Sequence, residues 1–146
     1  MSFVLAVVLS FAWPLSPAPV VRGYHPPPAP WLAGHRGVDL SGVVGAPVVA
    51  AAPGTVVFAG EVAGRGVVSI RHSGGVRTTY EPVLPAVAVG SPVAAGGTIG
   101  TLIAGHEGCP VAACLHWGAR RGADYLDPLA LLGLRRVRLL PLQGAQ

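Results

Sequence analysis

From residue 43 onward the sequence places short runs of Val, Ala, Thr and Ile between Gly and Pro residues, and this spacing constrains the fold more than any other feature. The runs cover residues 47–51, 54–59, 66–71, 76–80, 87–89, 98–103 and 114–119. β-Branched residues favour strands, whereas Gly and Pro at such intervals end them in tight turns. The pattern predicts an all-β fold, a small antiparallel β-sheet or barrel-like structure.

Two local signals refine this prediction. The segment His72-Ser-Gly-Gly75 separates two of the runs and predicts a hairpin turn, in which His72 would be exposed. Residues 128–134 are the only stretch typical of a helix, a turn or two that Gly133 would end.

The composition supports one compact domain and argues against nucleic acid as a partner. Hydrophobic residues make up 51% of the 146 residues and charged residues 11%, which suits a single core. The net charge of +4 owes much to Arg135, Arg136 and Arg138 in a basic tail, residues 135–146, and no basic stripe with interleaved aromatics is present. The chain has no Lys, which argues against a lipoyl- or biotinyl-carrier domain.

The N-terminus predicts export. Residues 1–12 form an apolar run too short to span a bilayer as a helix, and the run ends in Ser10-x-Ala12, a small-x-small cleavage pattern. We expect a signal peptide cut before Trp13 or, because no basic residue precedes the run, an uncleaved anchor that would be the only membrane contact. Residues 13–33 form a Pro-rich, extended lead-in, and residues 34–134 the domain itself.

Three side chains suggest a metal site. His35 and Asp39 supply an imidazole and a carboxylate within one short segment, and His116 places a third donor inside an apolar strand, where it is costly to bury without a partner. Three protein ligands of this kind are typical of catalytic zinc. The sequence therefore predicts Zn²⁺ as a cofactor.

Several motifs together resemble the lysostaphin-type, or LytM-like, zinc endopeptidases, which cut peptide cross-links of bacterial peptidoglycan. The motifs are Gly34-His35-Arg-Gly-Val-Asp39, residues 45–60, residues 89–100, and Leu115-His116-Trp117 followed by Asp127-Pro128. The resemblance implies that His35, Asp39 and His116 bind zinc. It also implies an antiparallel fold with a duplicated hybrid motif, peptidoglycan peptides as partners and a bacterial, extracytoplasmic location.

Two positions depart from the family. The family has His-x-His where this chain has Cys114-Leu115-His116, and Tyr-x-His where this chain has Tyr80-Glu81-Pro82. Both non-ligand histidines, which in the family act on the water and the oxyanion, are therefore absent. A positioned acid–base group contributes about 10²–10⁴-fold, so weak hydrolysis or a non-standard base is expected.

Candidates for a substitute base lie close by. His106 and Glu107 belong to a loop just before the strand that carries His116, and such a loop can fold over a metal site. Glu81 adjoins one of the lost positions, but strand neighbours point to opposite faces, so we expect it to face away from the metal.

The two cysteines leave alternatives open. Cys109 and Cys114 flank a four-residue turn, and in an exported protein they are expected to form a disulfide. Residues i and i+2 of a strand share a face, so a reduced Cys114 could instead join His116 as a fourth zinc ligand. A plain buried thiol is the remaining option.

The sequence thus supports two functions. The first is an exported zinc metalloendopeptidase that acts on peptidoglycan peptides, with a base from the 106–107 loop or with none. The second is an inactive zinc-binding domain that binds the cell wall or regulates another protein.

Overall fold

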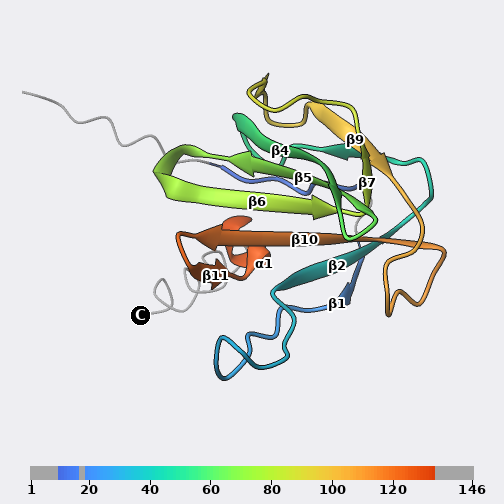
Figure 1. Ribbon diagram of the computed structural model, residues 1–146, viewed down its shortest axis with the longest axis vertical. Helices are drawn as coiled ribbons and strands as arrows, with labels where there is room; N and C mark the ends of the chain where they lie inside the picture. The colour runs from blue at the N-terminus through green and yellow to red at the C-terminus, as the bar shows by residue number, and fades with distance from the viewer. Residues whose placement is uncertain (1–9, 17–18, 134–146) are drawn as a thin grey trace, which may run out of the picture.

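The computed structural model describes residues 10–16 and 19–133, and Figure 1 shows them as β-strands with one short helix. The strands are β1 (Val20–Arg22), β2 (Gly37–Gly42), β3 (Pro47–Val49), β4 (Gly54–Val62), β5 (Arg65–Arg71), β6 (Val76–Glu81), β7 (Val83–Pro85), β8 (Pro92–Val93), β9 (Thr98–Leu102), β10 (Ala113–Arg121) and β11 (Asp124–Leu126). The helix α1 (Pro128–Leu131) begins at the N-cap Asp127, whose carboxylate accepts from the Leu129 N–H at 3.0 Å.

The strands form two antiparallel sheets. The 8-stranded sheet has the order β1-β2-β10-β6-β5-β4-β8, with β11 paired to the end of β10, and the 3-stranded sheet has the order β3-β9-β7. Figure 1 shows β2, β10, β6 and β5 side by side across the molecule. The all-β, antiparallel fold predicted from the sequence is confirmed.

Buried and partly exposed side chains alternate along the central strands of the large sheet. On β6, Thr78 and Tyr80 are fully buried, whereas Arg77, Thr79 and Glu81 alternate with them on the other face. β10 behaves likewise, since its apolar side chains enter the core and its polar ones do not. The polar face of these two strands is therefore available for a site.

Several strands differ from the sequence prediction. Residues 87–89 are not a strand, because β7 pairs with β9 four residues earlier, from Val83 opposite Leu102 to Pro85 opposite Gly100. β2 was not predicted as a strand, since its short GVDLSG sequence carries polar residues amid glycines. β1 and β11 pair only along sheet edges, where local sequence gives little signal.

His72 is buried rather than exposed, which corrects the expectation from the turn. Its Nδ1–H donates to the Pro53 carbonyl at 2.8 Å, and its Nε2 accepts from the Thr78 hydroxyl at 2.7 Å. Thr78 Oγ1 lies 2.8 Å from the Tyr80 hydroxyl, which also accepts from the Ala51 N–H at 3.1 Å. The imidazole thus ends a chain of hydrogen bonds that reaches into the core. Burial lowers the pKa of His72 and raises the pKa of Tyr80 to about 12.

The segment before β1 takes part in the core. Leu15 is fully packed, the Ala12 N–H donates to the Ala51 carbonyl at 2.8 Å, and the Phe11 ring meets His72 edge to face. The predicted boundary between residues 12 and 13 falls inside this packed segment. Most of the predicted leader and the whole predicted tail, residues 135–146, lie outside the described residues. In the described ranges no helix is long and apolar enough to cross a membrane.

Candidate metal centre

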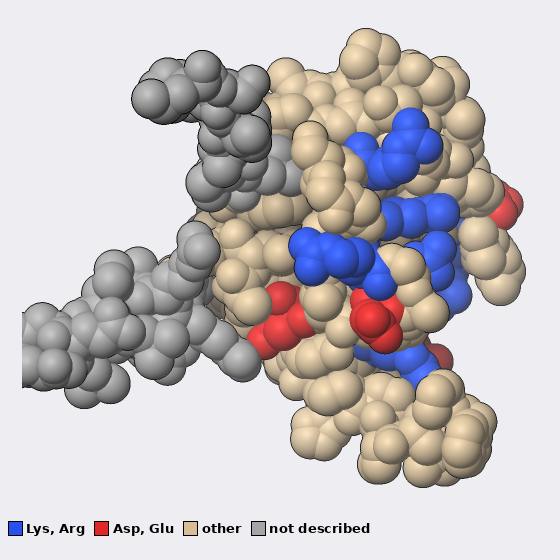
Figure 2. Space-filling view, turned by 90° about the vertical axis from the view of Figure 1, so that its left-hand side faces the viewer, with Lys and Arg blue, Asp and Glu red and all other residues tan. Residues whose placement is uncertain are grey.

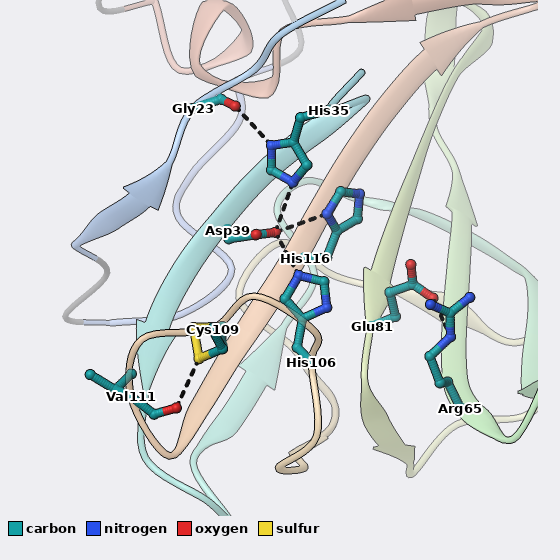
Figure 3. A network of polar contacts seen from close by, with 10 residues as sticks. Gly23, His35, Asp39, Arg65, Glu81, His106, Cys109, Val111 and His116 are labelled. Carbon is teal, nitrogen blue, oxygen red and sulfur yellow. Dashed lines mark hydrogen bonds and ion pairs between the residues drawn. A yellow bond between two sulfur atoms is a disulfide. The ribbon is translucent and has the colours of Figure 1, made fainter. Parts of the chain in front are cut away.

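Four side chains from three separate segments converge on the polar face of the large sheet (Figure 3). Asp39 is on β2 and His116 on β10, and the two are directly paired across the antiparallel register. His35 lies just before β2, held by an isolated backbone bridge to His25. His106 comes from the loop between β9 and β10. Sequence positions as far apart as 39 and 116 therefore become neighbours.

The four donors are close enough to share one ion. Asp39 Oδ1 lies 3.1 Å from His35 Nε2, 3.0 Å from His106 Nε2 and 2.9 Å from His116 Nδ1. One ligand atom from each residue lies within 4.8 Å of all the others. Three nitrogens and one oxygen at this separation match the donor set of tetrahedral zinc.

The hydrogen bond of His35 supports its role as a ligand. Because a carbonyl oxygen only accepts, the contact of His35 Nδ1 with the Gly23 carbonyl at 2.7 Å places the ring proton on Nδ1. In the neutral ring, Nε2 then turns a lone pair towards the Asp39 carboxylate, which is repulsive without a cation between them. Histidines that bind metal commonly donate their other N–H to a backbone carbonyl in this way.

His106 Nε2 gives a second sign of fit. This nitrogen is buried and lacks a well-aligned hydrogen bond, although it lies 3.0 Å from Asp39 Oδ1. A buried polar atom without a partner is costly, and a metal ion would satisfy it. The four residues thus fit a bound Zn²⁺.

The charge state of Asp39 suits the same role. Its side chain is almost completely buried, with 1% exposed. Burial acts to raise the pKa of Asp39, but the imidazoles of His116, His106 and His35 around the carboxylate outweigh burial, so the pKa falls from 3.8 to about 2. The carboxylate is therefore ionised at neutral pH.

Gly37 is a structural requirement of this centre that the sequence analysis missed. A Cβ built on Gly37 would lie 2.8 Å from His116 Nε2 and 2.5 Å from the Trp117 carbonyl oxygen. Glycine at this position therefore leaves room for the His116 ring and the Trp117 carbonyl. The His-x-Gly-x-Asp spacing could have signalled this close approach.

The other base candidates occupy different places. Glu107 is exposed and is not part of the four-residue group. Glu81 faces the same side as His116 and is paired with it across β6 and β10, which corrects the expectation that it faces away. The reason is that Tyr80 enters the core, so Glu81 must take the opposite face. Its carboxylate lies 3.9 Å from Arg65 Nε (Figure 3).

Cys109 and Cys114 form a disulfide with a Cα–Cα separation of 5.7 Å. This bond excludes Cys114 as a thiolate ligand and links the His106 loop to the strand that carries His116. Cys109 Sγ also lies 3.0 Å from the Val111 carbonyl oxygen, a contact without a shared proton because the sulfur is in the disulfide.

A groove of about 280 Å³ adjoins the centre, near the lower limit of small-molecule sites. The groove starts at His116 and Glu81 and runs along β6 and β10. The groove is also lined by Arg36, Arg77, Thr79, Gly118, Ala119, Arg120 and Tyr125. An extended peptide would have room to lie beside the metal centre.

The chain is similar in sequence to known proteins. The chain is 57% identical over 137 residues to an uncharacterized protein of Mycobacterium tuberculosis, covering 90% of this chain and 55% of that protein. It is 33% identical over 98 residues to the DD-carboxypeptidase/endopeptidase Mpg of Neisseria meningitidis, covering 66% of this chain and 22% of that protein. The chain thus spans about half the length of the mycobacterial relative and less of Mpg.

A solved structure has a similar fold. The catalytic domain of the antimicrobial peptidase lysostaphin from Staphylococcus simulans superposes with a TM-score of 0.65 at 28% identity, covering 79% of this chain and 92% of that domain. The model of peptidase family M23 matches residues 33–128, which include His35, Asp39, His106 and His116. The chain belongs to peptidase family M23.

Proposed function

We propose that this protein is a zinc-dependent endopeptidase that hydrolyses peptide cross-links of bacterial peptidoglycan outside the cytoplasm. The observation that carries the proposal is the group His35, Asp39, His106 and His116, whose donor atoms converge beside an open groove. The names of two relatives support the substrate class, since one is a DD-carboxypeptidase/endopeptidase and the other an antimicrobial peptidase.

In this proposal His35, Asp39 and His116 hold the zinc. Bound zinc supplies Lewis-acid chemistry, because it polarises the carbonyl under attack and activates water. The chain's own contribution is orientation: the Gly23 carbonyl fixes the His35 tautomer, and Gly37 leaves room for the His116 ring. The groove along β6 and β10 would align the peptide with the metal.

His106 takes the role of the base in this proposal. Its Nε2 reaches the same centre but comes from a loop rather than a strand, and its side chain is 12% exposed. From this place it would accept the proton of the attacking water. Glu107, the other base candidate in this loop, is exposed, so its variant serves as the comparison for the His106 variant.

The same four-donor group favours a second candidate function. Four protein ligands close a zinc site against water and make it structural. If His106 is a permanent ligand, the protein would be a zinc-binding domain that binds the cell wall or regulates a partner without hydrolysis. The two functions make opposite predictions for the His106 variant.

The test is release of soluble peptides from purified peptidoglycan by the full chain, with zinc or with a chelator. We expect the unmodified chain to release peptides only when zinc is present, and we expect His116→Ala to release none. His106→Ala should lower the rate by about 10²–10⁴-fold, whereas Glu107→Ala should leave it unchanged. Loss in Glu107→Ala with retention in His106→Ala would assign the base to Glu107.

Other outcomes decide between the candidates. Release by His106→Ala but not by the unmodified chain would mean that His106 closes the site. No release from any variant, with zinc bound to the unmodified chain, would support the binding function. A chain that binds no zinc would overturn both proposals.

A further inference from the structure

Three arginines form a row across the polar face of the large sheet. Arg71 on β5 is paired in register with Arg77 on β6, and Arg77 is paired with Arg120 on β10. Figure 2 shows arginine side chains gathered on this face of the molecule. Like charges directly opposite each other on neighbouring strands are destabilising. The fold therefore keeps an arrangement that costs stability.

The described residues do not neutralise this row. None of the ion pairs in the described ranges includes Arg77 or Arg120. Both side chains are half-buried, and the pKa of Arg77 is lowered by burial and by the charge of Arg120. Two half-buried guanidinium groups at paired positions of neighbouring strands offer a site for an anion.

The arginine pair lies in the groove of the metal centre. Arg77 and Arg120 line one end of the groove, and His116 and Glu81 line the other. Four residues of strand separate the two ends, which is about 13 Å. Because an extended peptide advances by nearly the same distance per residue, a peptide over the metal would bring its carboxylate to the arginines within about four residues.

We propose that Arg77 and Arg120 form an anion subsite that binds a free carboxylate of the peptide substrate. The planar fork of each guanidinium matches a carboxylate and donates two parallel hydrogen bonds to it. Tyr125, which faces Arg120 across β10 and β11 and whose ring lies 5.4 Å from Arg36, forms a wall of this subsite. The subsite would select peptide strands that end in a carboxylate over uncharged ones. This inference rests on the proposed peptidase function.

The test measures binding rather than hydrolysis. The probe is a pool of soluble peptidoglycan fragments, used untreated and after methyl esterification of its carboxylates, and binding to the full chain is followed by calorimetry. We expect untreated fragments to bind about tenfold more tightly than the esters, as for one charge-assisted hydrogen bond. In Arg77→Gln/Arg120→Gln the ratio should fall to about one.

Arg121→Gln is the matched control. Arg121 follows Arg120 in the chain and carries the same charge, but it is exposed, donates to the Gly74 carbonyl at 3.2 Å and does not line the groove. This variant should keep the preference for untreated fragments. The double variant should unfold at no lower temperature than the unmodified chain, because it removes a repulsive pair.

Two results would overturn the proposal. One is a preference for carboxylates that survives in the double variant. The other is displacement of the fragments by inorganic phosphate far more strongly than by acetate, which would assign the arginines to phosphate. The binding assay does not depend on turnover, so it is also run on His116→Ala. A failed subsite would appear in this assay, whereas a failed peptidase would appear only in the release assay.

Discussion

At Asp39 one carboxylate oxygen meets three imidazole nitrogens, and each nitrogen comes from a different part of the chain. Hydrogen bonds alone do not explain all three contacts when the His35 ring is neutral, because its one N–H donates to the Gly23 carbonyl. A cation resolves the conflict by accepting the lone pairs. The fit of the candidate site to a metal ion thus depends on the positions of individual donor atoms.

The residue scale gives a prediction for Gly37. In Gly37→Ala the new methyl group would press on the His116 ring and the Trp117 carbonyl. We expect zinc affinity to fall by about 10–100-fold, as when residues that orient ligands are changed. Competition with a chromogenic chelator measures this affinity.

Gly60→Ala provides the control for that prediction. Gly60 lies on β4, and a Cβ there meets only the Phe58 ring at ordinary contact distance, 3.6 Å. Zinc affinity should be unchanged in this variant. Equal affinities for both variants and the unmodified chain would show that Gly37 does not support the site.

At the scale of elements, β6 and β10 perform two tasks at once. Their inward side chains, Tyr80 and Trp117 among them, fill the core, and their outward side chains carry Glu81, His116 and the arginine pair. The loop between β9 and β10 adds His106 and is joined to β10 by the disulfide. A strand pair with one buried face thus holds the functional groups rigidly.

The turn between β5 and β6 gives a prediction about pH. The pKa of His72 in the folded chain lies below its ordinary value of 6.5 because the ring is buried. Below pH 6.5 the unfolded chain therefore binds more protons, so the free energy of unfolding decreases as the pH falls from about 6.5 towards the folded pKa. Protonation would also remove the acceptor of the Thr78 hydroxyl.

The measurement compares thermal unfolding of the unmodified chain and His72→Gln between pH 7.5 and pH 5.5, about one unit on either side of the ordinary histidine pKa. The unmodified chain should be the more stable at the upper pH, and its advantage should shrink at the lower pH. The difference between the two proteins removes the contribution of the histidines at the metal centre. A difference that stays constant with pH would contradict the role given to His72.

At the scale of the whole molecule, the metal centre joins segments that the backbone keeps far apart. β2, β10 and the loop that carries His106 each bring at least one side chain to this centre. The unfolded chain cannot hold this geometry, so zinc should bind the folded state far more tightly than the unfolded state. Metal binding and global stability are then linked.

We therefore expect zinc to raise the unfolding temperature of the full chain. At a free zinc concentration 100 times the Kd, the gain is about 2.7 kcal/mol. Calorimetric scans with zinc and with a chelator measure the shift in unfolding temperature. This shift should be small in His116→Ala. Identical scans with and without zinc would contradict a metal site that joins these segments.

Much of the fold followed from local sequence. Runs of β-branched residues bounded by Gly and Pro predicted most of the strands, because the former favour strands and the latter favour turns. Residues 87–89 failed this test, since β9 pairs with β7 instead. The residue types at 35, 39 and 116 also pointed to zinc, because imidazole and carboxylate are its ligands.

Only the tertiary structure decided which residues meet. Asp39 and His116, 77 positions apart, are paired because β2 and β10 share a register that neither strand encodes alone. The pairing of β6 with β10 turned Glu81 towards the groove, and together with the pairing of β5 with β6 it aligned Arg71, Arg77 and Arg120. Tertiary packing also buried His72. Local sequence sets the preference of each strand, whereas the site arises from long-range packing that satisfies all strands together.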